Sequence, residues 1–146
     1  MNNSITTKNP YNGALLEKYL MHSEDKIDSI LEVSETVFND WKHVSLKKRT
    51  KLLRNLGDVL NNNIERYSKL MTEEMGKPIT QSRAEIKKCI KLCDFYEANA
   101  ERFLSDRLIE TGAYETFISY DPLGPVLAIM PWNYPFRKYF VLLCPH

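Results

Sequence analysis

The sequence predicts an α/β protein in which a helical block precedes a few strands. Three observations predict this class. First, apolar residues recur at three- and four-residue steps between Glu24 and Leu104, which is the period of helices. Second, this period changes after Gly112. Finally, Val126–Met130 is a continuous apolar run bounded by turn residues. A strand this apolar is normally covered on both faces of a parallel sheet, so we expect most of its sheet to lie outside this sequence.

A turn and two helices are predicted in the first half of the chain. Asn9-Pro-Tyr-Asn-Gly13 is a turn cluster between two short segments, and Gly13 can supply a positive φ. The spacing of apolar residues predicts an amphipathic helix from Glu24 to about Trp41. Ser45 is the predicted N-cap of a second helix, which Asn61-Asn-Asn63 interrupts.

Two further helices follow. The third runs from Ile64 to Met75, because Gly76 stands where a C′ glycine belongs and Pro78 follows it. Thr80 is the predicted cap of a long fourth helix, Gln81 to about Leu104. The residues expected on its inward face are Ile86, Cys89, Ile90, Cys93, Phe95, Tyr96 and Ala100.

Extended structure is predicted after the fourth helix. Aromatic and β-branched residues between Tyr114 and Tyr120 favour a strand, and Asp121-Pro-Leu-Gly124 favours a turn. The apolar run Val126–Met130 is then the predicted buried strand, and it ends in the proline-rich loop around Pro131-Trp-Asn133. A rigid loop that follows a buried strand is a common place for reactive side chains in a fold.

Composition excludes several classes of function. The 146 residues include 20 basic and 19 acidic side chains, a net charge of +1, which favours neither nucleic acid nor an anionic membrane as a partner. The N-terminal residues form no secretory signal, and no apolar stretch is long enough to span a bilayer. Three unpaired cysteines fit a reducing compartment, so we expect a cytoplasmic protein.

Most of the chemically active residues have a simpler structural interpretation. Cys89 and Cys93 lie one helical turn apart, but no further ligand completes a metal site and burial in the core is favoured. Cys144 with His146 resembles a nucleophile and its base, although both are expected to be incidental at a chain end. The carboxylates Glu73, Glu74 and Glu85 are expected in capping or solvated positions. No glycine-rich phosphate loop is present.

Asn133 is the strongest candidate for a functional side chain. A carboxamide is a neutral hydrogen-bond donor that can stabilise a developing oxyanion. The flanking Pro131 and Pro135 restrict the backbone and would hold such a donor in place. The alternative is an ordinary asparagine in a proline-rich turn, a position that this residue type often occupies.

Several motifs resemble the aldehyde dehydrogenase superfamily. Pro122-Leu-Gly-Pro-Val126 followed by Ile129-Met-Pro-Trp-Asn-Tyr-Pro-Phe136 resembles its segment containing Pro-Trp-Asn, an aromatic residue and Pro. Three further parts of the chain resemble motifs that occur earlier in that family's sequences, in the same order. They are Asn9-Pro-Tyr-Asn-Gly13, Trp41 with the helix Ser45–Leu60, and Glu74-Met-Gly-Lys-Pro78 with Glu85. The sequence from Met130 to Phe136 is most similar to that of the succinate-semialdehyde dehydrogenase branch.

The resemblance implies roles for the loop residues. Asn133 would be the oxyanion-hole donor, while Ile129, Met130, Pro131 and Trp132 would line the site of NAD or NADP. Glu74-Met-Gly-Lys-Pro78 would be structural. The substrate would be a small aldehyde, such as succinate semialdehyde, oxidised to a carboxylic acid through a cysteine thiohemiacetal, and no metal is implied.

The resemblance also implies a division of the chain. Residues 1–113 would be the N-terminal helical part of the cofactor-binding domain, and 114–122 strands of an oligomerisation hairpin, through which a homo-oligomer would form. Residues 123–136 would be the first strand and the Pro-Trp-Asn loop of the Rossmann-like cofactor domain. Residues 137–146 would be a divergent tail.

The similarity weakens after Phe136, which predicts a truncated dehydrogenase. With permitted codons, the bases for Lys138–Pro145 can be read in another frame as Ile-Phe-Arg-Phe-Ala-Val-Pro, as expected for a frameshift. The family's catalytic cysteine and general-base glutamate lie beyond this segment, so the fragment alone is expected to be inactive. Two alternatives are a non-catalytic protein that binds dehydrogenase subunits through Tyr114–Tyr120, and an unstable product of a pseudogene.

Overall fold

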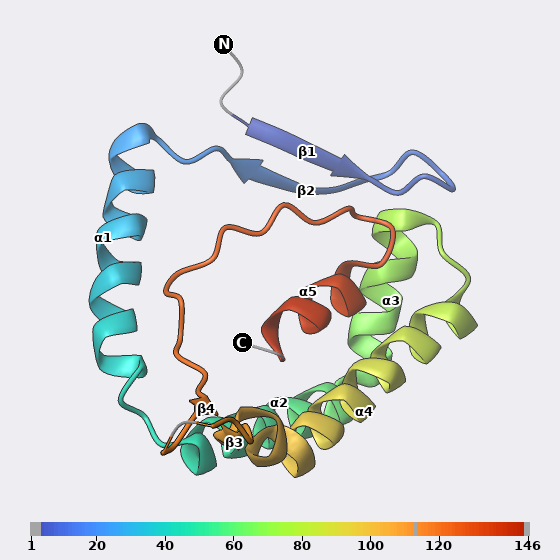
Figure 1. Ribbon diagram of the computed structural model, residues 1–146. Coiled ribbons are helices and arrows are strands. Elements are labelled where there is room, and N and C mark those ends of the chain that lie inside the picture. Colours follow the sequence, from blue (N-terminus) through green and yellow to red (C-terminus); the bar gives the residue numbers. More distant parts are fainter. Residues whose placement is uncertain (1–3, 113, 145–146) are drawn as a thin grey trace.

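The computed structural model describes residues 4–112 and 114–144, which form helices and two small antiparallel sheets (Figure 1). The elements in chain order are β1 (Ser4–Lys8), β2 (Leu15–Leu20), α1 (Glu24–Trp41), α2 (Leu46–Asn62), α3 (Ile64–Met75), α4 (Ile79–Leu104), β3 (Arg107–Leu108), β4 (Phe117–Ile118) and α5 (Pro135–Leu143). None of the helices in these described ranges is long and apolar enough to cross a bilayer.

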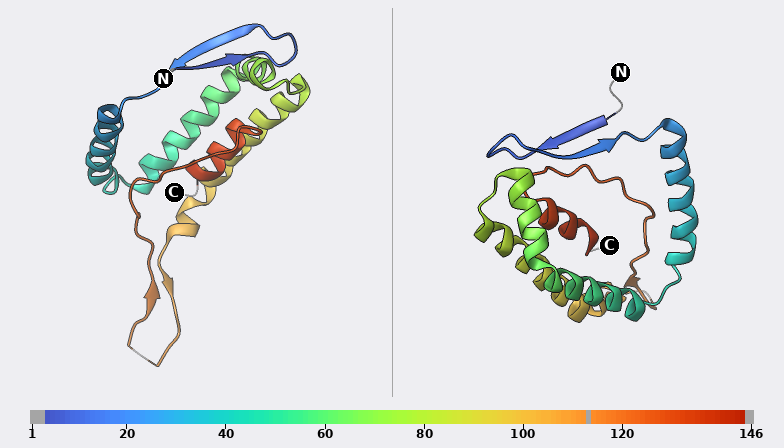
Figure 2. Two further views of the ribbon diagram at one scale, coloured as in Figure 1. Left: turned by 90° about the horizontal axis from the view of Figure 1, so that it is seen from above. Right: turned by 180° about the vertical axis from the view of Figure 1, so that it is seen from behind.

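The core lies around α4, the longest helix, which packs against α2, α3 and α5 (Figures 1 and 2). The apolar spacing of α4 turns one face toward these three helices, and Ile86, Cys89 and Cys93 on that face are fully buried. The buried core cluster consists of Leu60, Met71, Ile86, Cys89, Cys93, Phe140 and Cys144. The prediction that Cys89 and Cys93 pack in the core is therefore confirmed.

The N-terminal hairpin is built on the predicted turn. Gly13 adopts a φ of 72°, as expected, and the Asn9 carboxamide oxygen accepts a hydrogen bond of 2.9 Å from the Tyr11 N–H. The two short segments on either side of this turn pair as antiparallel strands. The Thr7 hydroxyl donates to Glu74 Oε1 over 3.1 Å, which ties the hairpin to the end of α3.

Helix α1 has the predicted bounds, and Ser23 caps it by accepting a hydrogen bond from the Lys26 N–H. Its apolar stripe is exposed, however: Ile27, Leu31 and Val33 keep 48%, 61% and 58% of their surface accessible. Figures 1 and 2 show α1 standing apart from the α4 core. The amphipathic pattern therefore indicates a face that the described residues do not cover.

The predicted boundaries of the other helices are right with small corrections. Helix α3 ends at Met75, with Gly76 in the left-handed conformation at a φ of 70°, as predicted. Helix α4 begins at Ile79 and Pro78 occupies its N-cap position, so the predicted cap Thr80 lies inside the helix. Proline favours a helix start because its φ is already restricted. Ser45 lies at the N-cap of α2 but its side chain makes no capping hydrogen bond.

The segment 114–134 departs most from the prediction. Phe117–Ile118 form β4, which pairs with Arg107–Leu108. The predicted strand Val126–Met130 is wrong, because residues 119–134 contain no regular secondary structure. The run is also not buried, since Leu127 is 88% and Ile129 is 89% exposed. A strand exists only by hydrogen bonding to a neighbour, and no neighbouring strand lies beside this run in the described structure.

The sequence prediction missed α5, having treated residues 137–146 as a divergent tail. A helical signal is present: Pro135 stands at the first position, and Phe136, Phe140 and Leu143 follow at helical spacing. Phe140 is only 3% exposed and belongs to the core. This helix fixes the downstream end of the Pro-Trp-Asn loop.

Candidate functional site

The loop Pro131–Asn133 lies between the irregular segment and the start of α5, and it is open to solvent. Trp132 is 77% exposed and Met130 is 40% exposed. Asn133 is exposed as well, and its carboxamide makes no hydrogen bond to the other residues that the structure describes. The structure thus brings Ile129, Met130, Pro131, Trp132 and Asn133 together as an exposed apolar run followed by an unengaged amide donor.

The loop is anchored where it enters α5. Tyr134 occupies the N-cap of α5 and its side chain makes no capping hydrogen bond. The missing cap comes instead from α4, because Glu85 Oε1 accepts a hydrogen bond of 3.0 Å from the Arg137 N–H. A carboxylate suits this position, since the first turn of a helix leaves N–H groups unpaired and carries partial positive charge.

Glu85 is itself held by Lys77, the residue that follows the left-handed Gly76. The Lys77 ammonium donates a hydrogen bond to Glu85 Oε2. The side chains are only 8% and 2% exposed, so the pair is buried. The same ammonium lies 3.8 Å from the centroid of the Tyr134 ring, a cation–π contact on the residue next to Asn133.

The sequence analysis expects Glu85 in a capping or a solvated position, and the structure agrees with the first and excludes the second: Glu85 caps the start of α5 and is only 3% exposed. Periodicity along α4 carried a signal for burial, because Ser82, Glu85 and Cys89 fall at steps of three and four residues and all three are buried. A buried carboxylate is stable here because both of its oxygens accept hydrogen bonds.

The three cysteines lie in the core and none is exposed. Burial, reinforced by the negative charge of Glu85, raises the pKa of the Cys89 thiol to about 12. Cys93 and Cys144 share a hydrogen bond, which raises the pKa of Cys93 together with burial. The same hydrogen bond lowers the pKa of Cys144 against the opposing effect of burial. Cys144 is 8% exposed and belongs to the core cluster, which does not favour it as a nucleophile, whereas His146 lies outside the described residues. Within those residues, no three metal-binding side chains cluster.

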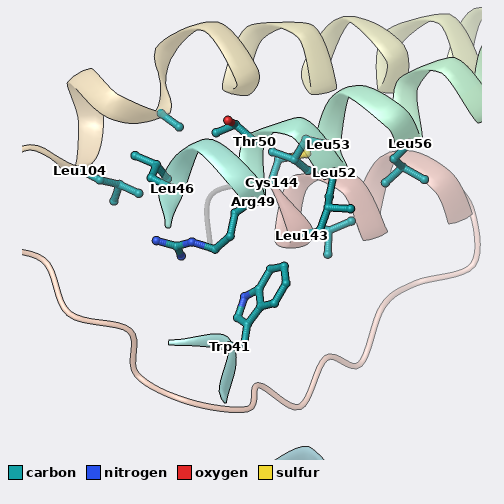
Figure 3. A pocket seen from close by; sticks show the side chains of 11 residues that line it. Trp41, Leu46, Arg49, Thr50, Leu52, Leu53, Leu56, Leu104, Leu143 and Cys144 are labelled. Carbon is teal, nitrogen blue, oxygen red and sulfur yellow. The ribbon is translucent and has the colours of Figure 1, made fainter. Parts of the chain in front are cut away.

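A separate apolar cavity of about 260 Å³ lies between α2, the end of α4 and the end of α5 (Figure 3). Leucines dominate its wall, together with Trp41 and Arg49. The Arg49 Nε atom is buried and has no hydrogen-bond partner within residues 4–112 and 114–144. The cavity includes none of the residues 129–133, so it is distinct from the loop site.

Comparison with known proteins identifies relatives of the whole chain. A sequence model described as "Aldehyde dehydrogenase family" matches residues 1–145, which includes the segment after Phe136. The chain is 37% identical over 142 residues to a probable succinate-semialdehyde dehydrogenase, NADP(+), of Synechocystis, covering 97% of this chain and 31% of that protein. It is 36% identical over 127 residues to a succinate semialdehyde dehydrogenase, NAD(P)+, of Escherichia coli, covering 87% and 28%.

Solved structures agree with this relationship. A succinic semialdehyde dehydrogenase from Streptococcus pyogenes, in complex with NADP+, superimposes with a TM-score of 0.92 at 25% identity, covering 96% of this chain and 31% of that one. An NADP-dependent glyceraldehyde-3-phosphate dehydrogenase from Bacillus halodurans, at 22% identity and a TM-score of 0.89, shares the fold. The predicted fold class is confirmed. The chain spans less than a third of the length of the curated relatives it matches, at 31% and 28%.

Proposed function

Because the chain belongs to the aldehyde dehydrogenase family, we propose that its Pro-Trp-Asn loop forms part of an active site that oxidises an aldehyde to a carboxylic acid with NAD or NADP. The observation that carries this proposal is the exposed, unengaged carboxamide of Asn133 on a loop anchored by a buried ion pair. The aldehyde we propose is succinate semialdehyde or a similar small semialdehyde, on the names of the two relatives.

Asn133 would stabilise charge on the substrate oxygen. When a thiolate adds to the aldehyde carbon, the carbonyl oxygen becomes an oxyanion, and the resulting thiohemiacetal must be held while it is oxidised. A neutral amide donor fits this task because it needs no change of protonation. The three cysteines of this chain are buried in the core, so we propose that the attacking thiolate and the general base lie outside these 146 residues, which alone would not turn over.

The exposed residues before Asn133 fit one wall of a dinucleotide site. Ile129, Met130 and Trp132 offer apolar surface that is 89%, 40% and 77% exposed, and Pro131 stiffens the run. Apolar walls with a few polar groups are typical of cofactor sites. When bound, the nicotinamide would accept the hydride, and these four residues would hold it beside the amide of Asn133.

The activity test uses the context of a complete dehydrogenase. This chain replaces the segment it matches in the Synechocystis relative, and formation of reduced cofactor is followed with succinate semialdehyde and NADP+ or NAD+. We expect turnover by the chimera and none by the 146-residue chain alone. A correctly folded chimera without turnover, or an active isolated chain, would contradict the proposal.

A second candidate function is binding to dehydrogenase polypeptides without catalysis. It is favoured by the uncovered apolar stripe of α1 and by the exposed β3–β4 hairpin, in which Leu108 and Phe117 are 71% and 56% exposed. The same hairpin is the surface we propose for a homo-oligomer. Co-purification of the chain with an intact relative tests this function, and failure to bind at micromolar concentrations would exclude it. The three free cysteines support a reducing compartment such as the cytoplasm.

A further inference from the structure

We propose that Lys77 and Glu85 are positioning residues whose buried ion pair holds the Asn133 loop in its orientation; the catalytic meaning of this inference rests on the proposed function. Both residues contact the chain immediately after Asn133. Lys77 lies against Tyr134, one residue later, and Glu85 accepts the Arg137 N–H, four residues later. Neither residue contacts a reacting group, so their effect would pass through the loop.

The two oxygens of Glu85 have different partners, which fixes the carboxylate in place. Oε2 accepts from the Lys77 ammonium and Oε1 accepts from the Arg137 backbone. Hydrogen bonds to an ionised group are stronger than neutral ones, and burial strengthens them further. Since Glu85 projects from the second turn of α4, beside the buried Ile86, the start of α5 is tied to the helix around which the core packs.

Helix α5 depends on this external cap. It has nine residues, and helices this short are not stable alone in water. The N-cap residue Tyr134 supplies no side-chain hydrogen bond, so Glu85 provides the acceptor that the sequence around the helix start lacks. Without it, the first turn would open and the loop before it would lose its fixed end.

Lys77 fixes the loop from the other side. Lys77 directly follows Gly76, whose left-handed φ of 70° ends α3. The ammonium then stands between the carboxylate of Glu85 and the ring of Tyr134. Pro131 and Pro135 restrict the backbone on both sides of Asn133, so the two contacts after the loop act on a backbone that already has little freedom.

The experiment measures the order of the loop in the native state of the complete chain. Backbone order parameters from ¹⁵N relaxation are recorded for Trp132, Asn133 and Arg137. In the unmodified chain we expect values in the rigid range, about 0.85, and in Glu85→Ala and Lys77→Met values below about 0.6 at Trp132 and Asn133. A merely structural ion pair would lower the urea midpoint without changing these values.

Three further variants keep the test decisive. Lys77→Arg retains the charge and should restore loop order, whereas Lys69→Met removes the lysine of the exposed Lys69–Glu73 pair and should leave it unchanged. If Glu85→Ala and Lys77→Met do not fold, the order of the loop is measured in Tyr134→Leu instead. Tyr134 is 40% exposed, and this substitution removes only the contact of its ring with the Lys77 ammonium. Loop order that is the same in all the folded variants and the unmodified chain would overturn the inference.

Kinetics of the chimera separate this inference from the proposed function. Glu85→Gln should lower kcat by about tenfold or more with little change in KM for the cofactor, because a displaced donor weakens only the transition state. An inactive unmodified chimera would refute the proposed function, while the order parameters would still decide whether the ion pair holds the loop. An active chimera with unchanged kcat in Glu85→Gln would overturn the positioning role.

Discussion

Replacing Lys77 by methionine should destabilise the chain strongly, because it leaves a buried carboxylate without its counter-ion. The Lys77 and Glu85 side chains are 8% and 2% exposed, so water cannot replace the lost ammonium. Breaking one partner out of a buried pair costs about 3–5 kcal/mol. Since domains of this size unfold with a free energy of about 5–15 kcal/mol, Lys77→Met should remove a large share of the total stability.

Urea unfolding followed by circular dichroism measures this loss, and Lys69→Met is the matched control. Lys69 also pairs with a glutamate, at 3.7 Å from Glu73, but the two side chains are 74% and 40% exposed. Exposed pairs one turn apart contribute about 0.5 kcal/mol or less. Adding Glu85→Leu to Lys77→Met should recover part of the loss by removing the unpaired charge. A difference below about 1 kcal/mol between the free energies of unfolding of Lys77→Met and Lys69→Met would show that Glu85 does not depend on Lys77 for its stability in the core.

Two further predictions concern stability in the same assay. Gly76→Ala should destabilise more than Gly13→Ala, because both positions have a positive φ but only at Gly76 would the added Cβ meet another residue, Pro10 Cγ at 3.0 Å; equal losses would contradict this. The raised pKa of Cys89, about 12 against 9.0 for an ordinary thiol, means that its contribution to stability is complete below pH 9.0 and is lost as the pH rises toward 12. The urea midpoint should therefore fall less steeply with pH above pH 9.0 in Cys89→Ala than in the unmodified chain. If the midpoint falls equally with pH in both proteins, the pKa of the Cys89 thiol is not raised by folding.

Local signals in the sequence predicted the helices well. The bounds of α1 and α3 follow from apolar spacing, and Gly76 ends α3 because only glycine readily adopts the left-handed conformation there. Such features depend on residues close together in the chain. The predicted strand Val126–Met130 failed for the opposite reason, since a strand depends on partners far away in sequence and none lies beside it.

The candidate site was predicted only in part. The sequence singled out Asn133 and its proline neighbours, because a rigid loop with an amide donor has a recognisable local pattern. It could not show that Lys77 and Glu85 anchor this loop, since the contact between Glu85 and Arg137 joins residues on different helices. The position of Glu85 on the apolar face of α4 was the only signal in the sequence, and it indicates that Glu85 is buried but not that it contacts Arg137.

The proposed role of Asn133 in the active site is tested most directly by the effect of Asn133→Ala on turnover in the chimera with the Synechocystis relative. Loss of one oxyanion donor typically lowers kcat by about 10²–10³-fold, so we expect a fall of that size with succinate semialdehyde and NADP+. Because Asn133 is exposed, the urea midpoint should not change. Asn61→Ala, at an exposed position on α2, should retain full turnover. If Asn133→Ala retains the kcat of the unmodified chimera, the loop is not part of the active site.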